Sequence, residues 1–558
     1  MTDRIDGGEA LLAACRSIGV DVIFSSPGSE WAPVWEALAR QTRDANPGPR
    51  YVDLHHETLA AAMATGYWLV TGRPQVVLVH AGPGLLQGAC GIHGALLTGA
   101  PMVVCSAESL TYGESGPDPG SQWYRNLSVV GGTQAVAAPF VKWSTQVGSI
   151  GTLYGTVLHA AEIATRGLAG PVYLNVPVEV LLEPWSPPAI TTRSVPPRGN
   201  RVSTPEDLDT AARRLVGAER PVIVTESAGR HPDGFDALTE LAELLAVPVV
   251  EPQSAVCANF PRTSVLHRGG DATALVAEAD LIVLVCCRAP WYPPSNRPEG
   301  PEVLVVDDVP HRAYADYQVL AADQYLEGDV GPTLRALTQT AKALGVSDER
   351  VAARTARLSE PERPPARPAA GTGVEPVAVV DCLRELLAPN ASVVDETITH
   401  SRVVQQHLRA ERPERYTYVQ GGLGQGLGVA LGMKMADPDR EVALVIGDGS
   451  LLYNPVVQAL SASQLLELPL LVVVFDNRSY ASMKRNHLRF YPDGAAVEQN
   501  DFRGVDLAAQ PDSAALVAPF GMLGRTVTDP DQLRPTIEEA LASVRRGVTA
   551  LVDVRVSR

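Results

Sequence analysis

An acidic residue and an amide residue each follow an apolar segment in the last third of the chain. Asp448 stands in a Gly-Asp-Gly turn after the apolar run 442–446. Asn477 comes just after the next apolar run, 470–475. Such runs predict buried parallel strands, and the carboxyl ends of parallel strands meet at the edge of a sheet where α/β folds bind ligands. Carboxylate, amide and carbonyl oxygens are ligands that Mg²⁺ prefers, often together with phosphates.

This stretch resembles the diphosphate-binding motif of thiamine diphosphate enzymes, in their acetolactate synthase and benzoylformate decarboxylase-like branch. The resemblance rests on the Gly-Asp-Gly turn, a helix expected over 455–466, a second strand and the Asn after it. It implies that Mg²⁺ is held by Asp448, Asn477 and the Ser479 carbonyl. It also implies that the diphosphate lies against the turn, with these residues in contact: Gly447, Gly449 and Ser450.

The motif departs from the family pattern in two ways. Asp476 stands where the first Asn of a pair is usual, and the spacing between Asp448 and Asn477 is a couple of residues longer than usual. Neither departure removes a ligand. The alternative interpretation is a Gly-Asp-Gly turn in some other doubly wound sheet.

Glu57 begins a stretch of small residues that predicts a helix. The family resemblance places an indispensable glutamate here, hydrogen-bonded to the pyrimidine ring of the cofactor. A carboxyl group at that point relays general acid–base catalysis through the cofactor. A solvated Glu at a helix start, favoured by the helix dipole, is the alternative.

A glycine-rich turn, 421–426, resembles the family element that supports the bent shape of the cofactor. Leu423 would be the apolar wedge between the two rings, and the Gly421 carbonyl would accept a hydrogen bond from the aminopyrimidine. Thr399 and Ser401 resemble hydroxyl residues that help to hold the diphosphate, although simple helix capping is the alternative. The glycines also look like a dinucleotide loop, but the strand-turn-helix context of that loop is missing.

The substrate side is expected near two turns of the first third of the chain. Ser29 and His80 match the active-site Ser and one active-site His of benzoylformate decarboxylase, although His80 could equally be a histidine at the edge of the core. The second histidine of that family has no clear counterpart, so we expect Trp291 and Tyr292 to line the pocket. Met483 stands where pyruvate decarboxylases carry an acidic residue. The polar, irregular segment 483–503 is either a lid or a solvated face.

These residues require three α/β units to position them. A length of 558 residues suits about three domains. Strands alternating with helices predict doubly wound parallel sheets. We expect a pyrimidine-binding domain over 1–187, a middle domain over 203–345 and a diphosphate-binding domain over 376–558, joined by Pro-rich linkers at 186–202 and 347–375.

The composition limits the classes of binding partner that we expect for this protein. A formal net charge of −17 argues against nucleic acid and anionic membranes. No apolar run reaches the length of a bilayer span, and the N-terminal residues do not resemble a signal peptide. Seven cysteines without a CxxC pair suggest buried free thiols in a reducing cytoplasm.

The sequence therefore predicts an enzyme that uses thiamine diphosphate and Mg²⁺ to decarboxylate a 2-oxo acid and to ligate the resulting enamine to an acceptor carbonyl, as acetolactate synthases do. Simple decarboxylation, as in benzoylformate decarboxylase, and a non-catalytic cofactor-binding homologue are the alternatives. FAD is not expected, because the middle unit has no convincing phosphate loop. The family resemblance implies a homodimer or homotetramer, since Glu57 and Asp448 lie on different units and relatives bind the cofactor between subunits.

Overall fold

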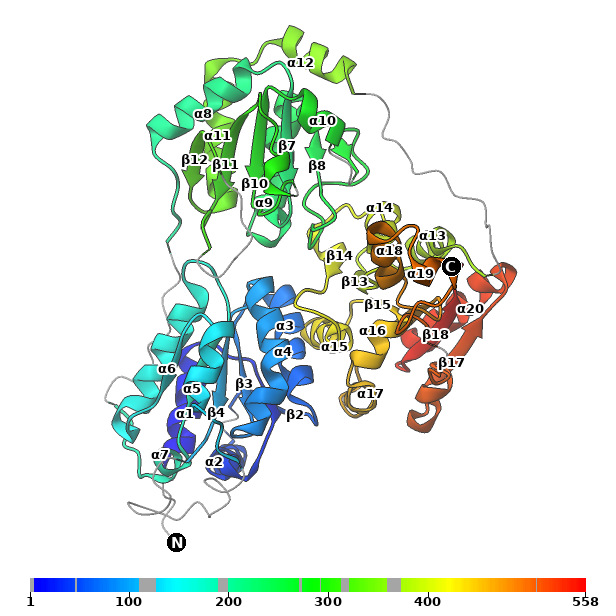
Figure 1. The fold of residues 1–558 in the computed structure, drawn as a ribbon. Helices are drawn as coiled ribbons and strands as arrows, with labels where there is room; N and C mark the ends of the chain where they lie inside the picture. The colour runs from blue at the N-terminus through cyan, green and yellow to red at the C-terminus, as the bar shows by residue number, and fades with distance from the viewer. Residues whose placement is uncertain are drawn as a thin grey trace.

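The computed structural model describes residues 5–45, 48–109, 127–188, 199–269, 273–291, 293–312, 321–358, 373–507 and 509–557. Three six-stranded sheets form its framework, and Figure 1 shows the first in blue and cyan, the second in green and the third in yellow to red. All of the strand pairs in the three sheets are parallel. Apolar clusters cover both faces of each sheet. The predicted α/β fold with three doubly wound parallel sheets is confirmed.

The first domain has the strand order β2-β1-β3-β4-β6-β5. Its central strands are apolar and completely buried, as strands covered on both faces must be. The strands are β1 Val22–Ser26, β2 Arg50–Asp53, β3 Gln75–Val79, β4 Met102–Ser106, β5 Ser144–Gln146 and β6 Val172–Asn175. The helices are α1 Gly7–Ser17, η1 Ser29–Trp31, α2 Ala32–Arg43, α3 Glu57–Thr71, α4 Pro83–Thr98, α5 Thr133–Ala137, η3 Ala138–Phe140, α6 Ile150–Thr165 and α7 Val178–Leu182.

The third domain has the order β14-β13-β15-β16-β18-β17. Counted from its own first strand, this order is the same as in the first domain, so the two domains share one topology. The strands are β13 Ser392–Glu396, β14 Tyr416–Tyr418, β15 Val442–Gly447, β16 Leu471–Asp476, β17 Leu523–Val527 and β18 Ala550–Arg555. The helices are α13 Pro376–Leu386, α14 Ser401–His407, η6 Pro413–Arg415, α15 Gly426–Ala436, α16 Asp448–Tyr453, α17 Val456–Leu465, α18 Ala481–Phe490, α19 Ala495–Glu498, η7 Ala515–Phe520 and α20 Pro530–Arg545.

The middle domain has a different order, β12-β11-β10-β7-β8-β9. From β7 the strands β8 and β9 are added on one side of the sheet, and β10, β11 and β12 are then added on the other side. The strand order thus switches between β7 and β10, and open α/β sheets form a crevice at such a switch point. The strands are β7 Pro221–Thr225, β8 Val249–Val250, β9 His267–Arg268, β10 Leu281–Val285, β11 Glu302–Asp307 and β12 Gln324–Glu327. The helices are α8 Pro205–Gly217, η4 Ala228–Arg230, α9 Gly234–Leu245, α10 Thr273–Glu278, η5 Pro294–Asn296, α11 Val330–Leu344 and α12 Asp348–Ala356.

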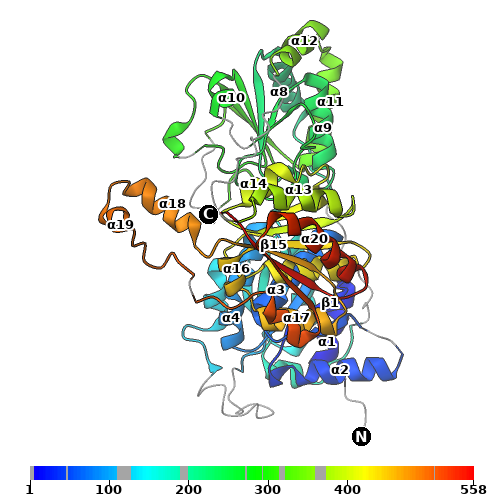
Figure 2. The same cartoon turned by 90° about the vertical axis from the view of Figure 1, so that its right-hand side faces the viewer.

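Two local predictions were wrong, and a third is extended by the structure. Part of the expected linker at 347–375 is helix α12, whose buried Arg354 donates to the Leu215 and Leu245 carbonyls of the middle domain. The helix expected over 455–466 is present as α17, and a separate short helix, α16, precedes it, with Pro455 between the two. The segment 483–503 contains α18 and α19, which bury no residue and project from the body of the molecule (Figure 2).

Helices α3 and α15 join the first and third domains. Gly66 and Gly432 lie at the contact, where a β-carbon built on either would stand 2.0 Å from a backbone carbonyl oxygen of the opposite helix. Gly428 faces Ala62 in the same way, at 2.5 Å. Because small residues let the two backbones approach, the facing sides of both sheets form one continuous hydrophobic cluster. Figure 1 shows α3 and α15 side by side between the two sheets.

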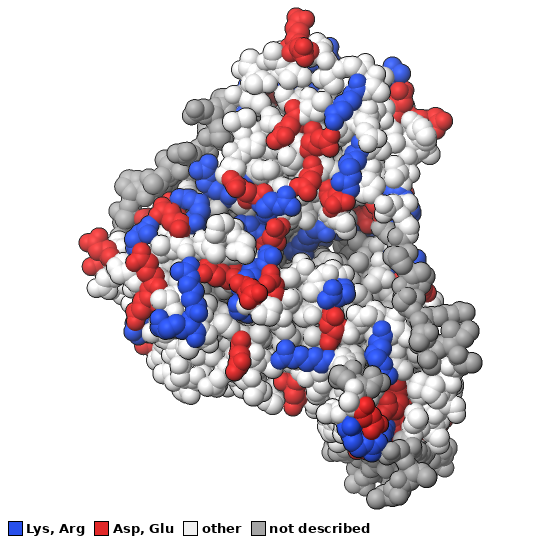
Figure 3. Space-filling model, turned by 180° about the vertical axis from the view of Figure 1, so that it is seen from behind, with Lys and Arg blue, Asp and Glu red and all other residues white. Residues whose placement is uncertain are grey.

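Acidic and basic side chains are interspersed over the face shown in Figure 3. Within the described ranges, no helix combines the length and the apolar character needed to cross a membrane.

Candidate functional site

The structure brings Asp448 and Asn477 to the same edge of the third sheet. Asp448 is the first residue of α16, directly after β15, and Asn477 directly follows β16. The two strands are parallel neighbours, with Gly447 paired to Phe475. Both polar side chains are buried. The arrangement on the carboxyl edge is the one that the sequence predicts for the metal site.

The oxygens at this edge suit a small divalent cation. Asp448 Oδ1 accepts the Gly449 N–H at 2.9 Å, whereas Asp448 Oδ2 is buried and has no hydrogen-bond partner among the described residues. Burial and the nearby Asp476 carboxylate raise the pKa of Asp448. Asn477 Oδ1 accepts the Ser479 N–H at 2.9 Å. A cation there would satisfy the lone carboxylate oxygen and offset the charge of Asp448, so the residues fit Mg²⁺.

The described residues contain no group of three or more His, Cys, Asp and Glu side chains that could hold a metal. The fit therefore rests on one carboxylate together with amide and carbonyl oxygens, which is a donor set for a hard cation.

Asp476, the departure from the family motif, takes part in a buried ion-pair network. Its side chain is completely buried, and it pairs with Arg555 and, at 3.4 Å, with Arg478. Gln510 Nε2 donates to Asp476 Oδ2 at 2.9 Å. These partners offset a charge that would be costly to bury alone. The substituted position therefore has structural partners of its own.

The turn before α16 is tightly packed. A β-carbon built on Gly449 would stand 2.4 Å from Cε1 of Tyr480, so a larger residue there would have to displace that ring. Ser450 is buried in the first turn of α16. Ser401 Oγ donates to the Ile398 carbonyl at 3.1 Å, and the Thr399 carbonyl accepts Arg485 at 3.2 Å. Thr399 therefore lies on the connection from β13 to α14, and Ser401 is the first residue of α14.

Glu57 lies at the start of α3, against α4. A β-carbon on Gly84 would come within 3.0 Å of Glu57 Oε1, and one on Gly88 within 3.2 Å of Glu57 Cβ. The glycines of α4 therefore leave the space that the glutamate side chain occupies.

The same helix touches the glycine-rich turn of the third domain. Gly421 and Gly94 are so close that a β-carbon on Gly421 would stand 2.4 Å from Gly94 Cα. Cys90 Sγ lies 3.9 Å from the Gly421 carbonyl oxygen. Leu423 is partly buried beyond this contact. Helix α4 thus contacts both Glu57 and the turn predicted to support the cofactor.

His80 is held by a carboxylate that sequence reasoning did not select. Glu30 is buried, and its Oε1 lies 2.9 Å from His80 Nδ1 and accepts the Ala81 N–H at 2.8 Å. The hydrogen bond that His80 donates to Glu30 raises the pKa of His80, against an opposing effect of burial. A β-carbon on Gly28 would stand 1.8 Å from His80 Nδ1. Ser29, in the same turn, is exposed. The only feature of the sequence that could have indicated Glu30 is its place directly after Ser29 in the Pro-Gly-Ser-Glu turn.

Glu396 is a second residue that the sequence did not single out for chemistry. It ends β13, is buried, and accepts the N–H groups of Gly424 and Gln425, both at 2.9 Å. Burial raises its pKa to about 7, against hydrogen bonds that lower it. A carboxylate at the end of an apolar strand was the only signal.

The remaining predicted substrate residues do not gather around His80. Trp291 is buried in the hydrophobic core on one face of the middle sheet. Tyr292 lies outside the described residues. Met483 is half exposed on α18, which projects away from the sheets (Figure 2).

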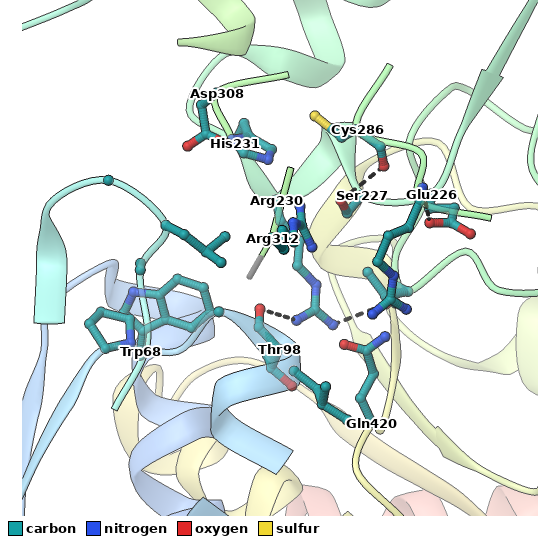
Figure 4. Close-up of a pocket in the computed structure, with 18 of the residues that line it drawn as sticks. Trp68, Thr98, Glu226, Ser227, Arg230, His231, Cys286, Asp308, Arg312 and Gln420 are labelled. Carbon is teal, nitrogen blue, oxygen red and sulfur yellow. Dashed lines mark hydrogen bonds between the residues drawn. The ribbon is translucent and has the colours of Figure 1, made fainter. Parts of the chain in front are cut away.

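A cavity of about 280 Å³ lies between the first and middle domains, and Figure 4 shows it. Arg230 crosses it, donating to the Thr98 carbonyl of the first domain at 3.3 Å and to the Val256 carbonyl of the middle domain at 3.1 Å. Gln420 of the third domain lies beside the same guanidinium. None of the residues selected for chemistry lines this cavity, so it is separate from the site described above.

Comparison with protein families matches all three domains in order. The thiamine pyrophosphate enzyme N-terminal TPP binding domain matches residues 5–129, the central domain residues 208–337 and the C-terminal TPP binding domain residues 397–554.

Individual relatives extend over nearly the whole chain. The acetolactate synthase large subunit of Parasynechococcus marenigrum is 27% identical over 99% of this chain and 88% of that protein. Benzoylformate decarboxylase of Pseudomonas aeruginosa is 26% identical over 95% of both chains. The solved structure of the thiamine diphosphate-dependent 4-hydroxybenzoylformate decarboxylase of Rhodococcus jostii shares the fold, with a TM-score of 0.82 over 99% of both chains at 24% identity.

Proposed function

The chain belongs to the thiamine pyrophosphate enzymes, and from that premise we propose that it uses thiamine diphosphate and Mg²⁺ to decarboxylate a 2-oxo acid. The observation that carries this proposal is the buried Asp448 Oδ2, which has no hydrogen-bond partner in the described part of the chain and lies with Asn477 on the carboxyl edge of the third sheet. Thiamine diphosphate supplies the nucleophilic carbon and the electron sink that decarboxylation of a 2-oxo acid requires.

Different residues of the chain are proposed to bind the metal, to bind the cofactor and to transfer a proton. Asp448 Oδ2, the Asn477 side chain and the Ser479 carbonyl are proposed to hold Mg²⁺, and the turn Gly447–Ser450 the diphosphate. Glu57 Oε1 is proposed to exchange a proton with a pyrimidine ring nitrogen, a general acid–base role. Leu423 and the Gly421 carbonyl are proposed to contact the cofactor rings.

His80 is proposed to transfer a proton on the substrate side. Its Nδ1 lies 2.9 Å from Glu30 Oε1, which orients the ring at the carboxyl end of the first sheet and suits it to proton transfer near neutral pH. General acid–base help of this kind is worth roughly 10²–10⁴-fold in rate.

Two outcomes follow decarboxylation. Ligation of the remaining fragment to an acceptor carbonyl is the first candidate, because His80 is the only motif-matched proton donor on the substrate side, so that an acceptor can compete with protonation. Simple decarboxylation with aldehyde release is the second, and the Glu30–His80 contact favours it, because a raised pKa keeps His80 protonated over a wider pH range.

A panel of 2-oxo acids tests the proposal. Carbon dioxide release is measured with thiamine diphosphate and Mg²⁺, with and without aldehyde and 2-oxo acid acceptors, and the products are identified by mass spectrometry. Release that depends on both additions supports the proposal. Absence of cofactor binding by calorimetry contradicts it, whatever the substrate panel.

The assembly is proposed to be a homodimer or homotetramer. Sedimentation of the loaded protein is expected to show a dimer or a larger even assembly. A fully active monomer would contradict this assignment.

A further inference from the structure

We propose that Glu396 is a positioning residue that clamps the glycine-rich turn 421–425 to helix α16. The inference deepens the proposed function and rests on it, because these two segments matter together only where a cofactor lies against both.

The first half of the clamp holds the turn. Glu396 Oε1 accepts the N–H groups of both Gly424 and Gln425 at 2.9 Å. Gly424 and Gln425 directly precede helix α15, which begins at Gly426, so the two bonds hold the chain where it enters the helix. No side chain of α15 itself caps this end. A carboxylate at a helix N-terminus is further favoured by the helix dipole.

The turn needs such an anchor. Gly421, Gly422 and Gly424 have φ values of +87°, +105° and +102°, so glycines occupy each of these left-handed positions. Glycine has the widest conformational freedom of any residue, and from within the turn the Gln425 side chain donates across it to the Gln420 carbonyl at 3.2 Å. Two hydrogen bonds to one buried oxygen restrict the turn, and they thereby set the position of Leu423.

The second half of the clamp reaches α16. Asn454, which directly follows α16, donates through Nδ2 to Glu396 Oε2 at 2.7 Å and to the Ser450 carbonyl at 3.0 Å. Its Oδ1 accepts the Leu427 N–H at 3.2 Å. Asn454 therefore caps the end of α16 and the start of α15 together.

A single buried carboxylate thus connects the turn that carries Leu423 with the helix that begins at Asp448. Neither Glu396 nor Asn454 is a predicted cofactor contact. Their effect on the cofactor is expected to pass through the geometry of these two segments.

Glu396→Gln tests the clamp in the full chain. The amide can still accept the two turn N–H groups, but its NH₂ group faces Asn454 Nδ2, so two donors meet and the charge is lost. We expect thiamine diphosphate, titrated with Mg²⁺ by calorimetry, to bind about 10- to 100-fold more weakly, in keeping with loss of a charge-assisted hydrogen bond. In the apoprotein, amide hydrogen exchange of a peptide covering 420–427 is expected to accelerate.

Asn454→Ala is the second variant, because it leaves both bonds from Glu396 to the turn in place. We expect it to weaken cofactor binding with less effect on exchange at Gly424 and Gln425. Glu539→Gln is the matched control, since Glu539 lies in the same domain but in an exposed ion pair with Arg525. It should bind the cofactor like the wild type.

Three results would overturn the clamp. Unchanged cofactor affinity in Glu396→Gln is one. Faster exchange spread evenly over the whole third domain is another, because it would mark a general stabilising residue. Equal weakening by Glu539→Gln is the third. If the wild type itself binds no thiamine diphosphate, the proposed function fails; if the wild type and all variants bind equally, only the clamp fails.

Discussion

His80 Nδ1 lies 2.9 Å from Oε1 of Glu30, a carboxylate that is buried to 1% exposure at the carboxyl end of the first sheet. The same oxygen accepts the Ala81 N–H, so a backbone hydrogen bond holds the carboxylate in place in addition to its contact with the imidazole. The hydrogen bond to Glu30 thereby orients the imidazole ring of His80.

This pair makes stability depend on pH. Glu30 raises the pKa of His80 above its ordinary 6.5, so the folded state holds the proton more tightly than the unfolded chain. The stabilisation is complete below about pH 6.5 and is lost as pH rises through the raised pKa of the folded state. Glu30→Gln should remove this dependence. NMR titration of His80 checks it, and an unchanged His80 pKa in the variant would contradict it.

Asp448→Ala should abolish retention of Mg²⁺ and thiamine diphosphate, because the buried Oδ2, which has no hydrogen-bond partner among the described residues, is the carboxylate oxygen proposed to hold the ion. We expect at least a 100-fold loss of cofactor affinity by calorimetry. Binding at wild-type affinity would mean that the metal site lies elsewhere.

Asp448→Asn should stabilise the apoprotein. The folded pKa of Asp448 is raised above 3.8, so the folded state binds the proton more tightly and loses stability as pH rises from about 4 toward that raised pKa. The variant should therefore gain on the order of 1–3 kcal/mol in the free energy of unfolding at pH 8. Denaturant unfolding at pH 8 and pH 4 measures the gain, which should shrink at the lower pH. Equal stability at pH 8 would contradict the burial of this charge.

Glu57→Gln should leave the fold and the metal site intact while slowing proton exchange at C2 of bound thiamine diphosphate. An amide cannot deliver a proton to the pyrimidine ring, so the general acid–base relay is lost. Hydrogen–deuterium exchange at C2, followed by NMR after acid quench, is the measurement. Exchange at the wild-type rate would remove Glu57 from the relay.

Gly432→Ala should destabilise the protein by about 1–3 kcal/mol, because its β-carbon would stand 2.0 Å from the Met63 carbonyl oxygen and would force α3 and α15 apart. Gly155→Ala is the control. That glycine lies in α6 with nothing within 4 Å of an added β-carbon. Replacing Gly155 with alanine should leave the stability of the protein unchanged or raise it slightly. Thermal unfolding compares the two variants.

Much of the fold could be predicted from the sequence, but less of the candidate site. Apolar runs such as 442–446 and 470–475 predicted buried parallel strands, because a strand that is buried on both faces is apolar at successive positions and does not alternate between polar and apolar residues. Asp448 and Asn477 followed from those strands, since the edge of a parallel sheet is fixed by strand direction. Helix α16 was missed because six residues before Pro455 give too short a pattern to show a period.

Long-range contacts were harder to read. Glu30 and His80 are 50 residues apart, and Glu396 and Asn454 are 58 apart, so nothing local indicates that they meet. Trp291 has an aromatic side chain that suits a pocket, yet it is buried in the middle-domain core. Its burial depends on the packing of the whole sheet, which the residues around position 291 do not encode.

The glycine-lined contact between α3 and α15 has a consequence for how the chain folds during synthesis. The apolar side of α3 packs against residues near position 429, which emerge from the ribosome roughly 360 residues later, or about 20–70 s at ordinary elongation rates. Throughout that interval the first domain presents an uncovered hydrophobic helix while the middle domain is being made. Nascent chains of this protein are therefore expected to depend on chaperones that cover α3 until the third domain arrives.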